Sequence, residues 1–218
     1  MKLAGQGLYA ITNGPRESLL DAVDSALRGG ARVIQYRDKT NDSARRFAEA
    51  HAIAELCASY RVRLIINDDL ELAMEIESAG VHFGKEDGDV ASARARLGET
   101  KIMGISCYDS LERARDAVDA GADYLVFGAF FTSPTKPLAP RASLDLLRAA
   151  KQFGLPLVAI GGITPDNARL LIDAGADYVA AISSVFALPD SDVAASDSTD
   201  AGIDRIAENA ARFARLFH

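Results

Sequence analysis

The chain has few cysteines and no tryptophan. Its 218 residues include only Cys57 and Cys107, and these do not form a CxxC pair or any other metal-ligand spacing. Two cysteines are also too few for a disulfide framework of the kind found in secreted domains. The sequence therefore predicts a reduced, cytoplasmic environment.

Long apolar runs and an excess of positive charge are also missing. No stretch of about 18 uninterrupted apolar residues occurs, so we expect no membrane span, and the start of the chain lacks the apolar core of a secretory signal. Lys and Arg number 24 against 31 Asp and Glu, which gives a net charge of −7. Such a chain is not expected to bind nucleic acid or acidic membranes. We expect a soluble protein whose partners are small molecules.

The composition is that of a soluble domain with a sizeable core: 49% of the residues are apolar and 25% are charged. A length of 218 residues fits one small (β/α)8 barrel or two smaller domains. A recurring pattern favours the barrel. Ala120–Val126 (AGADYLV) and Ala174–Ala180 (AGADYVA) are nearly identical, and looser copies occur at Gly29–Gln35 and Ala79–Phe83. Since glycine commonly ends a helix, each copy predicts a turn from helix to strand.

Further apolar runs predict four more strands, and amphipathic segments separate all the strands. The added strands are Leu8–Thr12, Leu64–Asn67, Ile102–Ser106 and Leu157–Ile160. The expected helices are Leu19–Leu27, Ser43–Tyr60, Leu70–Ser78, Val90–Leu97, Leu111–Ala120, Leu144–Phe153, Asp166–Asp173 and Ile203–Phe217. This alternation predicts a single α/β domain over residues 1–218, a (β/α)8 TIM barrel. A doubly wound open sheet is the alternative, but no Gly-rich dinucleotide turn follows the first strand.

Reactive residues of such barrels lie at the C-terminal ends of the strands. Alternation after the second strand predicts that Gln35, Arg37 and Lys39 point into the barrel mouth, while Ile34 and Tyr36 pack against helices. Cations buried there are costly unless an anion is bound. The other interpretation is a charged strand end on the surface.

Carboxylates follow the third and fourth strands, at Asp68, Asp69 and Asp87. Carboxylates on adjacent strands repel unless a cation bridges them, and oxygen ligands suit Mg²⁺. Asp69 is also well placed to be a helix N-cap, an explanation that does not extend to Asp68 and Asp87 together.

Two segments have the character of phosphate sites. Gly161–Asp166 follows the seventh strand, with Thr164 as the expected N-cap and Pro165 as the first helical residue. The eighth strand is expected to end in Ile182-Ser183-Ser184. Together with Ser183, the glycine segment matches the usual phosphate position of this fold. The long loop Phe130–Pro140 carries Ser133, Thr135 and Lys136, and it is either a lid over phosphates or a plain exposed connection. The acidic segment Pro189–Gly202 is expected to be a surface loop.

The sequence indicates no Ser-His-Asp or Cys-His arrangement. His82 is expected to make a structural hydrogen bond, and Cys107 is expected to be a packed thiol. The predicted site is therefore rich in cations, assisted by a metal, and poor in general bases.

Seven motifs, taken together and in order, resemble those of the thiamine phosphate synthase family. They are QYRDK (35–39), INDD (66–69), VHFGKED (81–87), GIS (104–106), TSPTK (132–136), AIGGIT (159–164) and ISS (182–184). The resemblance implies a transferase that joins a hydroxymethylpyrimidine diphosphate to a hydroxyethylthiazole phosphate, giving thiamine phosphate and diphosphate.

The resemblance also implies residue roles. The pyrimidine diphosphate would be bound by Gln35, Arg37, Asp38, Lys39, Asn67, Ser106 and Lys136, and the thiazole phosphate by Ser133, Thr135, Gly162, Ile182 and Ser183. Asp68 and Asp87 would hold Mg²⁺, the implied cofactor. Arg37, Lys39, Ser106 and Lys136 would form the catalytic set.

Four positions depart from the family pattern: Asp38, Ser133, Lys85 and Tyr108 stand where Glu, Thr, Gln and His are more usual. Three alternatives remain. A thiazole tautomerase-like relative would need no metal but would need a His where Tyr108 stands. A different phosphate-binding barrel, such as a sugar-phosphate epimerase, and a non-catalytic module that binds a thiamine precursor are the others. The sequence does not indicate the oligomeric state.

Overall fold

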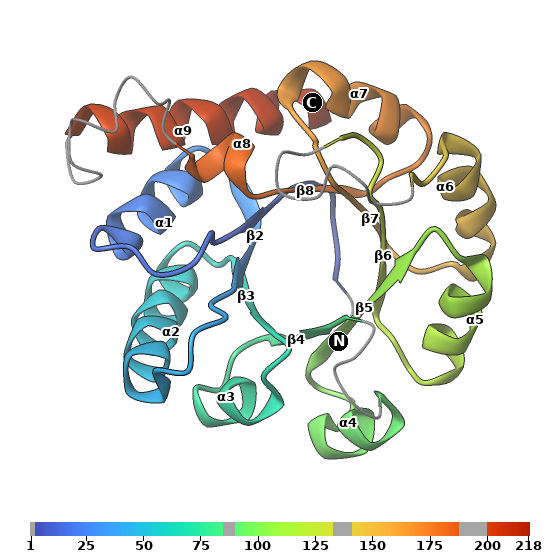
Figure 1. The fold of residues 1–218 in the computed structure, drawn as a ribbon, viewed down its shortest axis with the longest axis horizontal. Helices are drawn as coiled ribbons and strands as arrows, with labels where there is room; N and C mark the ends of the chain where they lie inside the picture. The colour runs from blue at the N-terminus through green and yellow to red at the C-terminus, as the bar shows by residue number, and fades with distance from the viewer. Residues whose placement is uncertain (1–2, 85–89, 133–140, 188–199) are drawn as a thin grey trace.

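The strands form a closed barrel in a computed structural model that describes residues 3–84, 90–132, 141–187 and 200–218. The strand order around the barrel is the order along the chain, from β1 to β8. Every neighbouring pair is parallel, including β1 with β8. Figure 1 looks into the ring of strands, with the helices outside it. The predicted TIM barrel is confirmed, and the open sheet is not found.

The strands and helices of the structure lie close to the segments predicted from the sequence. The strands are β1 (Gly7–Ile11), β2 (Ala31–Tyr36), β3 (Arg63–Asn67), β4 (Gly80–Phe83), β5 (Ile102–Tyr108), β6 (Tyr124–Phe127), β7 (Leu157–Ile160) and β8 (Tyr178–Ala181). The helices are α1 (Leu19–Arg28), α2 (Ser43–Ser59), α3 (Leu70–Glu75), α4 (Val90–Leu97), α5 (Leu111–Asp119), α6 (Leu144–Ala150), α7 (Pro165–Asp173), α8 (Ser183–Phe186) and α9 (Asp200–Ala214). Short 3₁₀ turns, η1 (Lys151–Phe153) and η3 (Arg215–Phe217), extend α6 and α9.

The predicted end of the eighth strand is wrong. The eighth strand was expected to run through Ser184, but β8 ends at Ala181 and the chain turns into α8. Val185 and Phe186 are buried in the core. A helical turn brings both to the same side, whereas an extended strand would place them on opposite faces.

The recurring Ala-Gly pattern marks turns as predicted at three of its four copies. Gly30, Gly121 and Gly175 have positive φ values of 95°, 88° and 109°. At the fourth copy the turn is made earlier, by Glu77 with a φ of 53°. Gly80 is instead the first residue of β4, and a Cβ there would lie 2.0 Å from the carbonyl oxygen of Ile102.

The two nearly identical copies do the same structural work. The carboxylate of Asp123 accepts a hydrogen bond from the N–H of Met103 at 2.9 Å, and Asp177 accepts one from Leu157 at 2.9 Å. Each aspartate thus ties the turn before one strand to the strand that precedes it in the barrel.

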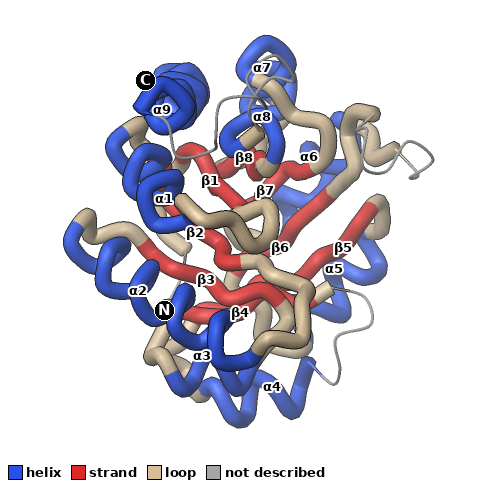
Figure 2. The backbone as a smooth tube through the Cα atoms, turned by 60° about the vertical axis from the view of Figure 1, so that its left-hand side comes forward, coloured by secondary structure: helices blue, strands red, loops and turns tan. Residues whose placement is uncertain are grey.

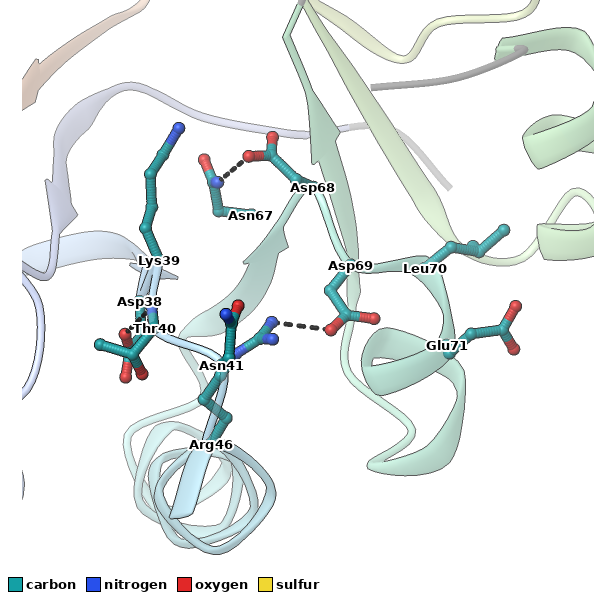
Figure 3. A pocket seen from close by; sticks show the side chains of 10 residues that line it. All are labelled: Asp38, Lys39, Thr40, Asn41, Arg46, Asn67, Asp68, Asp69, Leu70 and Glu71. Atoms are coloured by element: carbon teal, nitrogen blue, oxygen red, sulfur yellow. Dashed lines mark hydrogen bonds and ion pairs between the residues drawn. The ribbon is translucent and has the colours of Figure 1, made fainter. Parts of the chain in front are cut away.

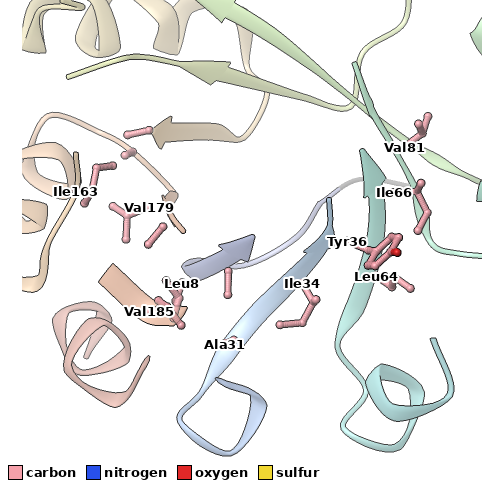
Figure 4. Packing of buried hydrophobic residues seen from close by; sticks show 14 of the residues in the cluster. Leu8, Ala31, Ile34, Tyr36, Leu64, Ile66, Val81, Ile163, Val179 and Val185 are labelled. Carbon is pink, nitrogen blue, oxygen red and sulfur yellow. The ribbon is translucent and has the colours of Figure 1, made fainter. Parts of the chain in front are cut away.

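Buried apolar side chains form two clusters separated by the barrel wall. The outer cluster lies between strands and helices and includes Ile34 and Tyr36 (Figure 4). The inner cluster fills the barrel and includes Val33 and Tyr178. The predicted alternation along β2 is therefore confirmed. Figure 2 shows the helices around the strands in a view turned by 60°.

The end of the barrel where the strands begin is covered by the start of the described chain. Leu3 is 1% exposed and belongs to the inner cluster, and the carbonyl oxygen of Ala4 accepts a 2.8 Å hydrogen bond from the Tyr178 hydroxyl. Over the described ranges, no helix combines the length and apolar character needed to cross a bilayer.

Candidate active site

The loops after β2 and β3 enclose an open pocket of about 470 Å³ at the barrel mouth. Lys39, Asn67 and Asp68 line it together with Asp38, Thr40, Asn41, Arg46, Asp69, Leu70 and Glu71. In Figure 3 the Lys39 side chain runs alongside Asn67, and Asn67 lies between Lys39 and Asp68. The pocket thus brings four predicted site residues together, namely Asp38, Lys39, Asn67 and Asp68.

The loop after β2 is held in shape by a buried carboxylate. The Asp38 side chain is 0% exposed, and it lies 2.7 Å from Nη2 of Arg45 on α2. Its other oxygen accepts a 2.8 Å hydrogen bond from the N–H of Thr40. Burial alone would raise the pKa of Asp38, but the contacts with Thr40 and Arg45 outweigh it and lower the pKa. These contacts fix the loop that carries Arg37 and Lys39.

Arg37 is positioned through its backbone by a residue that the sequence did not single out. The hydroxyl of Thr12, at the end of β1, accepts a hydrogen bond from the N–H of Arg37 at 2.8 Å and donates to its carbonyl oxygen at 3.2 Å. Thr12 is completely buried. A hydroxyl at a strand end is common, and only the β1–β2 register identifies its partner.

The carboxylates after β3 have separate tasks. Asp69 caps α3 by accepting from the N–H of Leu72 at 3.0 Å, and it pairs with Arg46 at 2.7 Å, so the expected N-cap is confirmed. Asp68 has a φ of 63°, and one of its oxygens accepts from the Asn67 amide at 2.6 Å. Asp68 therefore lines the mouth beside Asn67, away from the helix cap.

Oxygen donors suited to a hard cation are present in this pocket. The Asp68 carboxylate and the Asn67 side-chain carbonyl are the ligand types that Mg²⁺ prefers. Within the described ranges, no group of three or more His, Cys, Asp and Glu side chains could hold a metal ion. Asp87 lies outside those ranges, so it stays a prediction as a ligand.

Two predicted residues of the barrel wall bond to interior aromatic side chains. Gln35, which is 3% exposed, donates to the Tyr9 hydroxyl at 2.9 Å. The Ser106 hydroxyl lies 2.9 Å from Nε2 of His82, which confirms that His82 makes a side-chain hydrogen bond. The side chains of Gln35 and Ser106 are therefore each held by a buried side chain inside the barrel.

The turn after β7 is built on a glycine that leaves no room for a side chain. Gly162 has a φ of 62°, and a Cβ on it would lie 2.5 Å from the carbonyl oxygen of Thr132. Thr164 is the N-cap of α7 and Pro165 its first residue, as predicted. Asn167 accepts from the Thr164 N–H at 2.9 Å and donates to the Gly162 carbonyl at 3.1 Å. These bonds hold the turn open toward the mouth.

The short helix α8 completes that side of the mouth. Its N-cap is Ile182 and its first residue is Ser183, which is exposed. The hydroxyl of Ser184 donates to the carbonyl of Ile163 at 2.5 Å and so joins α8 to the turn after β7. In this fold, phosphates commonly bind at the loops after the seventh and eighth strands and at the N-terminus of a short extra helix.

The base of the long loop after β6 runs beside the glycine turn. The N–H groups of Phe130 and Phe131 donate to the carbonyls of Ile160 and Gly161 at 3.2 and 3.0 Å. Ser133, Thr135 and Lys136 come directly after this base and lie outside the described residues. Their expected contacts therefore stay predictions.

Neither thiol is placed for chemistry. Cys57 and Cys107 are both buried, and burial raises the pKa of each to about 12. The expectation that Cys107 is a packed thiol is confirmed by its exposure of 0%.

Comparison with known proteins gives one consistent result. The family model described as thiamine monophosphate synthase matches residues 8–185. A thiamine-phosphate synthase of Marinobacter nauticus is 50% identical over 192 residues, covering 87% of this chain and 86% of that protein. One from Alcanivorax borkumensis is 51% identical over 190 residues, covering 85% and 88%. A solved structure of a thiamine phosphate pyrophosphorylase from Pyrococcus furiosus is 29% identical, with a TM-score of 0.81 and coverage of 97% and 95%.

Proposed function

The chain belongs to the thiamine monophosphate synthase family, and we infer from this membership the reaction that it catalyses. It is a transferase that joins hydroxymethylpyrimidine diphosphate to hydroxyethylthiazole phosphate. The bond between the pyrimidine methylene carbon and the diphosphate oxygen breaks, and a bond from that carbon to the thiazole nitrogen forms. The nitrogen supplies a lone pair and loses no proton, so the reaction requires no protein nucleophile or strong base.

We propose that the two substrates bind at different parts of the barrel mouth. Gln35, Arg37, Lys39, Asn67, Ser106 and Lys136 hold the pyrimidine diphosphate, and Ser133, Thr135, Gly162, Ile182 and Ser183 hold the thiazole phosphate. The observation that supports this division is the separation of the two kinds of site. Lys39 and the amide of Asn67 line the pocket between the loops after β2 and β3. The glycine turn follows β7 and the short helix α8 follows β8.

The chain's cations act on the leaving group in this proposal. As the carbon–oxygen bond breaks, negative charge grows on the diphosphate. Arg37, Lys39 and Lys136 stabilise this charge from fixed positions, and Ser106 donates a hydrogen bond. Asp38 has its carboxylate turned to Arg45 and Thr40. We therefore propose that Asp38 acts by holding the Arg37–Lys39 loop.

We propose that Mg²⁺ is the cofactor, with Asp68 and Asp87 as its protein ligands. The support for Asp68 is its place in the pocket next to Asn67. When bound, the ion would neutralise part of the diphosphate charge. Asp69 is engaged with Arg46 and the α3 cap, so we leave it out of the ligand set.

We further propose a single-domain cytoplasmic enzyme over residues 1–218 that takes phosphorylated small molecules as its partners. The barrel strands span residues 7–181, and α9 packs against α1 at the chain's other end. That packing supports one domain.

A two-substrate assay tests the reaction and the cofactor together. Purified protein is mixed with both precursors, and diphosphate and thiamine phosphate are measured with Mg²⁺ and with EDTA. We expect equal amounts of both products with Mg²⁺ and neither with EDTA. Isomerisation of a thiazole phosphate alone would instead favour the tautomerase-like alternative. Binding of precursors without diphosphate release would favour a non-catalytic module.

A further inference from the structure

A chain of hydrogen bonds crosses the barrel interior beneath the mouth. Its links are Gln35 Nε2 to Tyr9 Oη (2.9 Å), Tyr9 Oη to Tyr124 Oη (2.8 Å), Tyr124 Oη to His82 Nδ1 (3.3 Å) and His82 Nε2 to Ser106 Oγ (2.9 Å). The three inner members, Tyr9, Tyr124 and His82, come from β1, β6 and β4, and we call them the relay. The relay joins a residue on β2 to one on β5, and both of these face the mouth.

The relay is buried, so its polar atoms depend on one another. Tyr9, Tyr124 and His82 are 1%, 0% and 7% exposed. A buried hydroxyl without a partner is costly, and each link therefore constrains the next. Burial raises the pKa of both phenols above the ordinary tyrosine value. Each phenol keeps its single proton and has one hydrogen bond to donate.

A glycine makes room for the central ring. A Cβ on Gly104 of β5 would lie 1.9 Å from Cζ of Tyr124. The Tyr124 ring thus occupies the space that a side chain at Gly104 would fill, and it stacks beside the His82 ring at a centroid distance of 5.8 Å. Gly104 belongs to the GIS motif, whose serine is the last member of the chain.

The first link sets the direction of the others. The structure places the Gln35 amide nitrogen, which can only donate, against Tyr9 Oη. In the order that follows from this placement, Tyr9 donates to Tyr124, Tyr124 donates to Nδ1 of His82, and a neutral His82 donates from Nε2 to Ser106. The Ser106 hydroxyl proton is left to donate toward the mouth. The same distances fit the reverse order, so the amide can turn over only if every link reverses with it.

The same direction fixes which edge Gln35 presents. With one N–H committed to Tyr9, the carbonyl oxygen and the second N–H remain side by side on the free edge of the amide. That acceptor–donor pair matches the exocyclic amine and neighbouring ring nitrogen of an aminopyrimidine. It opposes the reversed pattern of a 4-oxo-pyrimidine, which carries an acceptor beside a ring N–H.

We propose that the relay consists of positioning residues that lock the Gln35 amide in the orientation selecting an aminopyrimidine over an oxopyrimidine. This rests on the proposed binding of the pyrimidine diphosphate by Gln35. The relay touches no substrate. It acts by denying the amide the flip that would accept the wrong ring.

The test compares Tyr9→Phe and Tyr124→Phe with Tyr178→Phe. Tyr178 is 1% exposed, belongs to the same inner cluster, and bonds to Ala4 at the far end of the barrel. The readout is the ratio of kcat/KM for the aminopyrimidine diphosphate to that for its 4-oxo analogue, together with KM for the thiazole phosphate. We expect Tyr9→Phe and Tyr124→Phe to reduce the ratio about tenfold, as loss of one hydrogen bond worth about 1.4 kcal/mol would. Tyr178→Phe should keep the ratio, and KM for the thiazole phosphate should stay constant.

Two controls separate this inference from the proposed function. If Gln35→Ala leaves KM for the pyrimidine diphosphate unchanged, the substrate assignment itself fails. If Gln35→Ala raises that KM but the relay variants discriminate like the unaltered protein, only the relay proposal fails. The ¹⁵N NMR spectrum of His82 in the unaltered enzyme gives an independent check. The Nε2–H tautomer supports the proposed direction, whereas an Nδ1–H tautomer or an imidazolium overturns it.

Discussion

Arg45 on α2 lies 2.7 Å from the carboxylate of Asp38, and the Asp38 side chain has no exposed surface. The pair ties the loop after β2 to the helix that follows it, just beside the exposed Lys39. A carboxylate buried this completely is tolerated because it pairs with Arg45 and accepts a hydrogen bond from the Thr40 N–H. The shape of the proposed pyrimidine diphosphate site therefore depends on Asp38, whose carboxylate is buried against Arg45.

The first prediction concerns the acid sensitivity of this pair. The pKa of Asp38 is lowered in the folded protein, so its stabilising contribution is complete above the unfolded value of about 3.9 and is lost as the pH falls through the folded value. We expect Asp38→Asn to be less stable than the parent at pH 7 and the difference to shrink below about pH 4. Urea unfolding at a series of pH values measures this. Asp145→Asn, at a side chain that is 88% exposed, should show little effect, and a pH-independent difference for Asp38→Asn would contradict the role.

The second prediction concerns Lys39, which lines the same pocket as Asn67. Removing one preorganised contact to a developing charge lowers kcat by about 10²–10³-fold, and we expect Lys39→Ala to lose that much. Lys151 is a suitable control because it lies in η1, before β7, at the opposite end of the barrel. Steady-state kinetics of diphosphate release measure both variants. Comparable rates for Lys39→Ala and Lys151→Ala would remove Lys39 from the catalytic set.

The third prediction concerns the glycine turn. A Cβ at Gly162 would lie 2.5 Å from the Thr132 carbonyl oxygen, and an alanine there would have to adopt a φ of 62°. Gly154 has a φ of 65° with nothing within 4 Å of its Cβ position, so it isolates the backbone strain of about 1–2 kcal/mol. We expect both alanine variants to lose stability in thermal unfolding. Only Gly162→Ala should also raise KM for the thiazole phosphate, and an unchanged KM would count against the phosphate site.

The fourth prediction concerns the metal. Asn tolerates the left-handed backbone that Asp68 adopts, so Asp68→Asn removes the charge and leaves the fold intact. We expect its Mg²⁺ affinity, measured by calorimetry with the pyrimidine diphosphate present, to fall roughly tenfold or more, a loss of at least 1.4 kcal/mol. Asp69→Asn is the matched control because Asn also caps helices. Equal losses in the two variants would show that the pocket senses net charge without a specific ligand.

The fifth prediction concerns the thiols. Burial raises the pKa of Cys57 and Cys107 to about 12, and the thiolate is the reactive form. We expect iodoacetamide at pH 8 to leave both unmodified in the folded protein and to alkylate both in urea. Mass spectrometry counts the adducts. Rapid alkylation of Cys107 in the folded protein would reopen the question of its reactivity.

The sequence predicted the barrel well because local periodicity carries that information. Alternation along Val33–Tyr36 separates an inner face from an outer one, and the Ala-Gly copies mark where helices end. The sequence did not predict the short helix α8, because four residues are too few to show a helical period. Its cause is tertiary: Val185 and Phe186 must both reach the core.

The site was predicted in part for a similar reason. Residues at strand ends can be identified from strand alternation alone, so the sequence singled out Gln35 and Lys39 as candidates. Their supports were not found, because these lie on other elements. Arg45 reaches Asp38 from α2, Thr12 reaches Arg37 from β1, and Tyr9 meets Tyr124 from a position 115 residues away. Nothing in the spacing of such residues indicates that they touch.

The end of the barrel where the strands begin is covered, and this limits how reactants can enter. Leu3 and Ala4 close off the interior there, and packed side chains such as Val33 and Tyr178 fill the axis. Reactants and products of the proposed reaction therefore share the opening at the other end, where the strands finish.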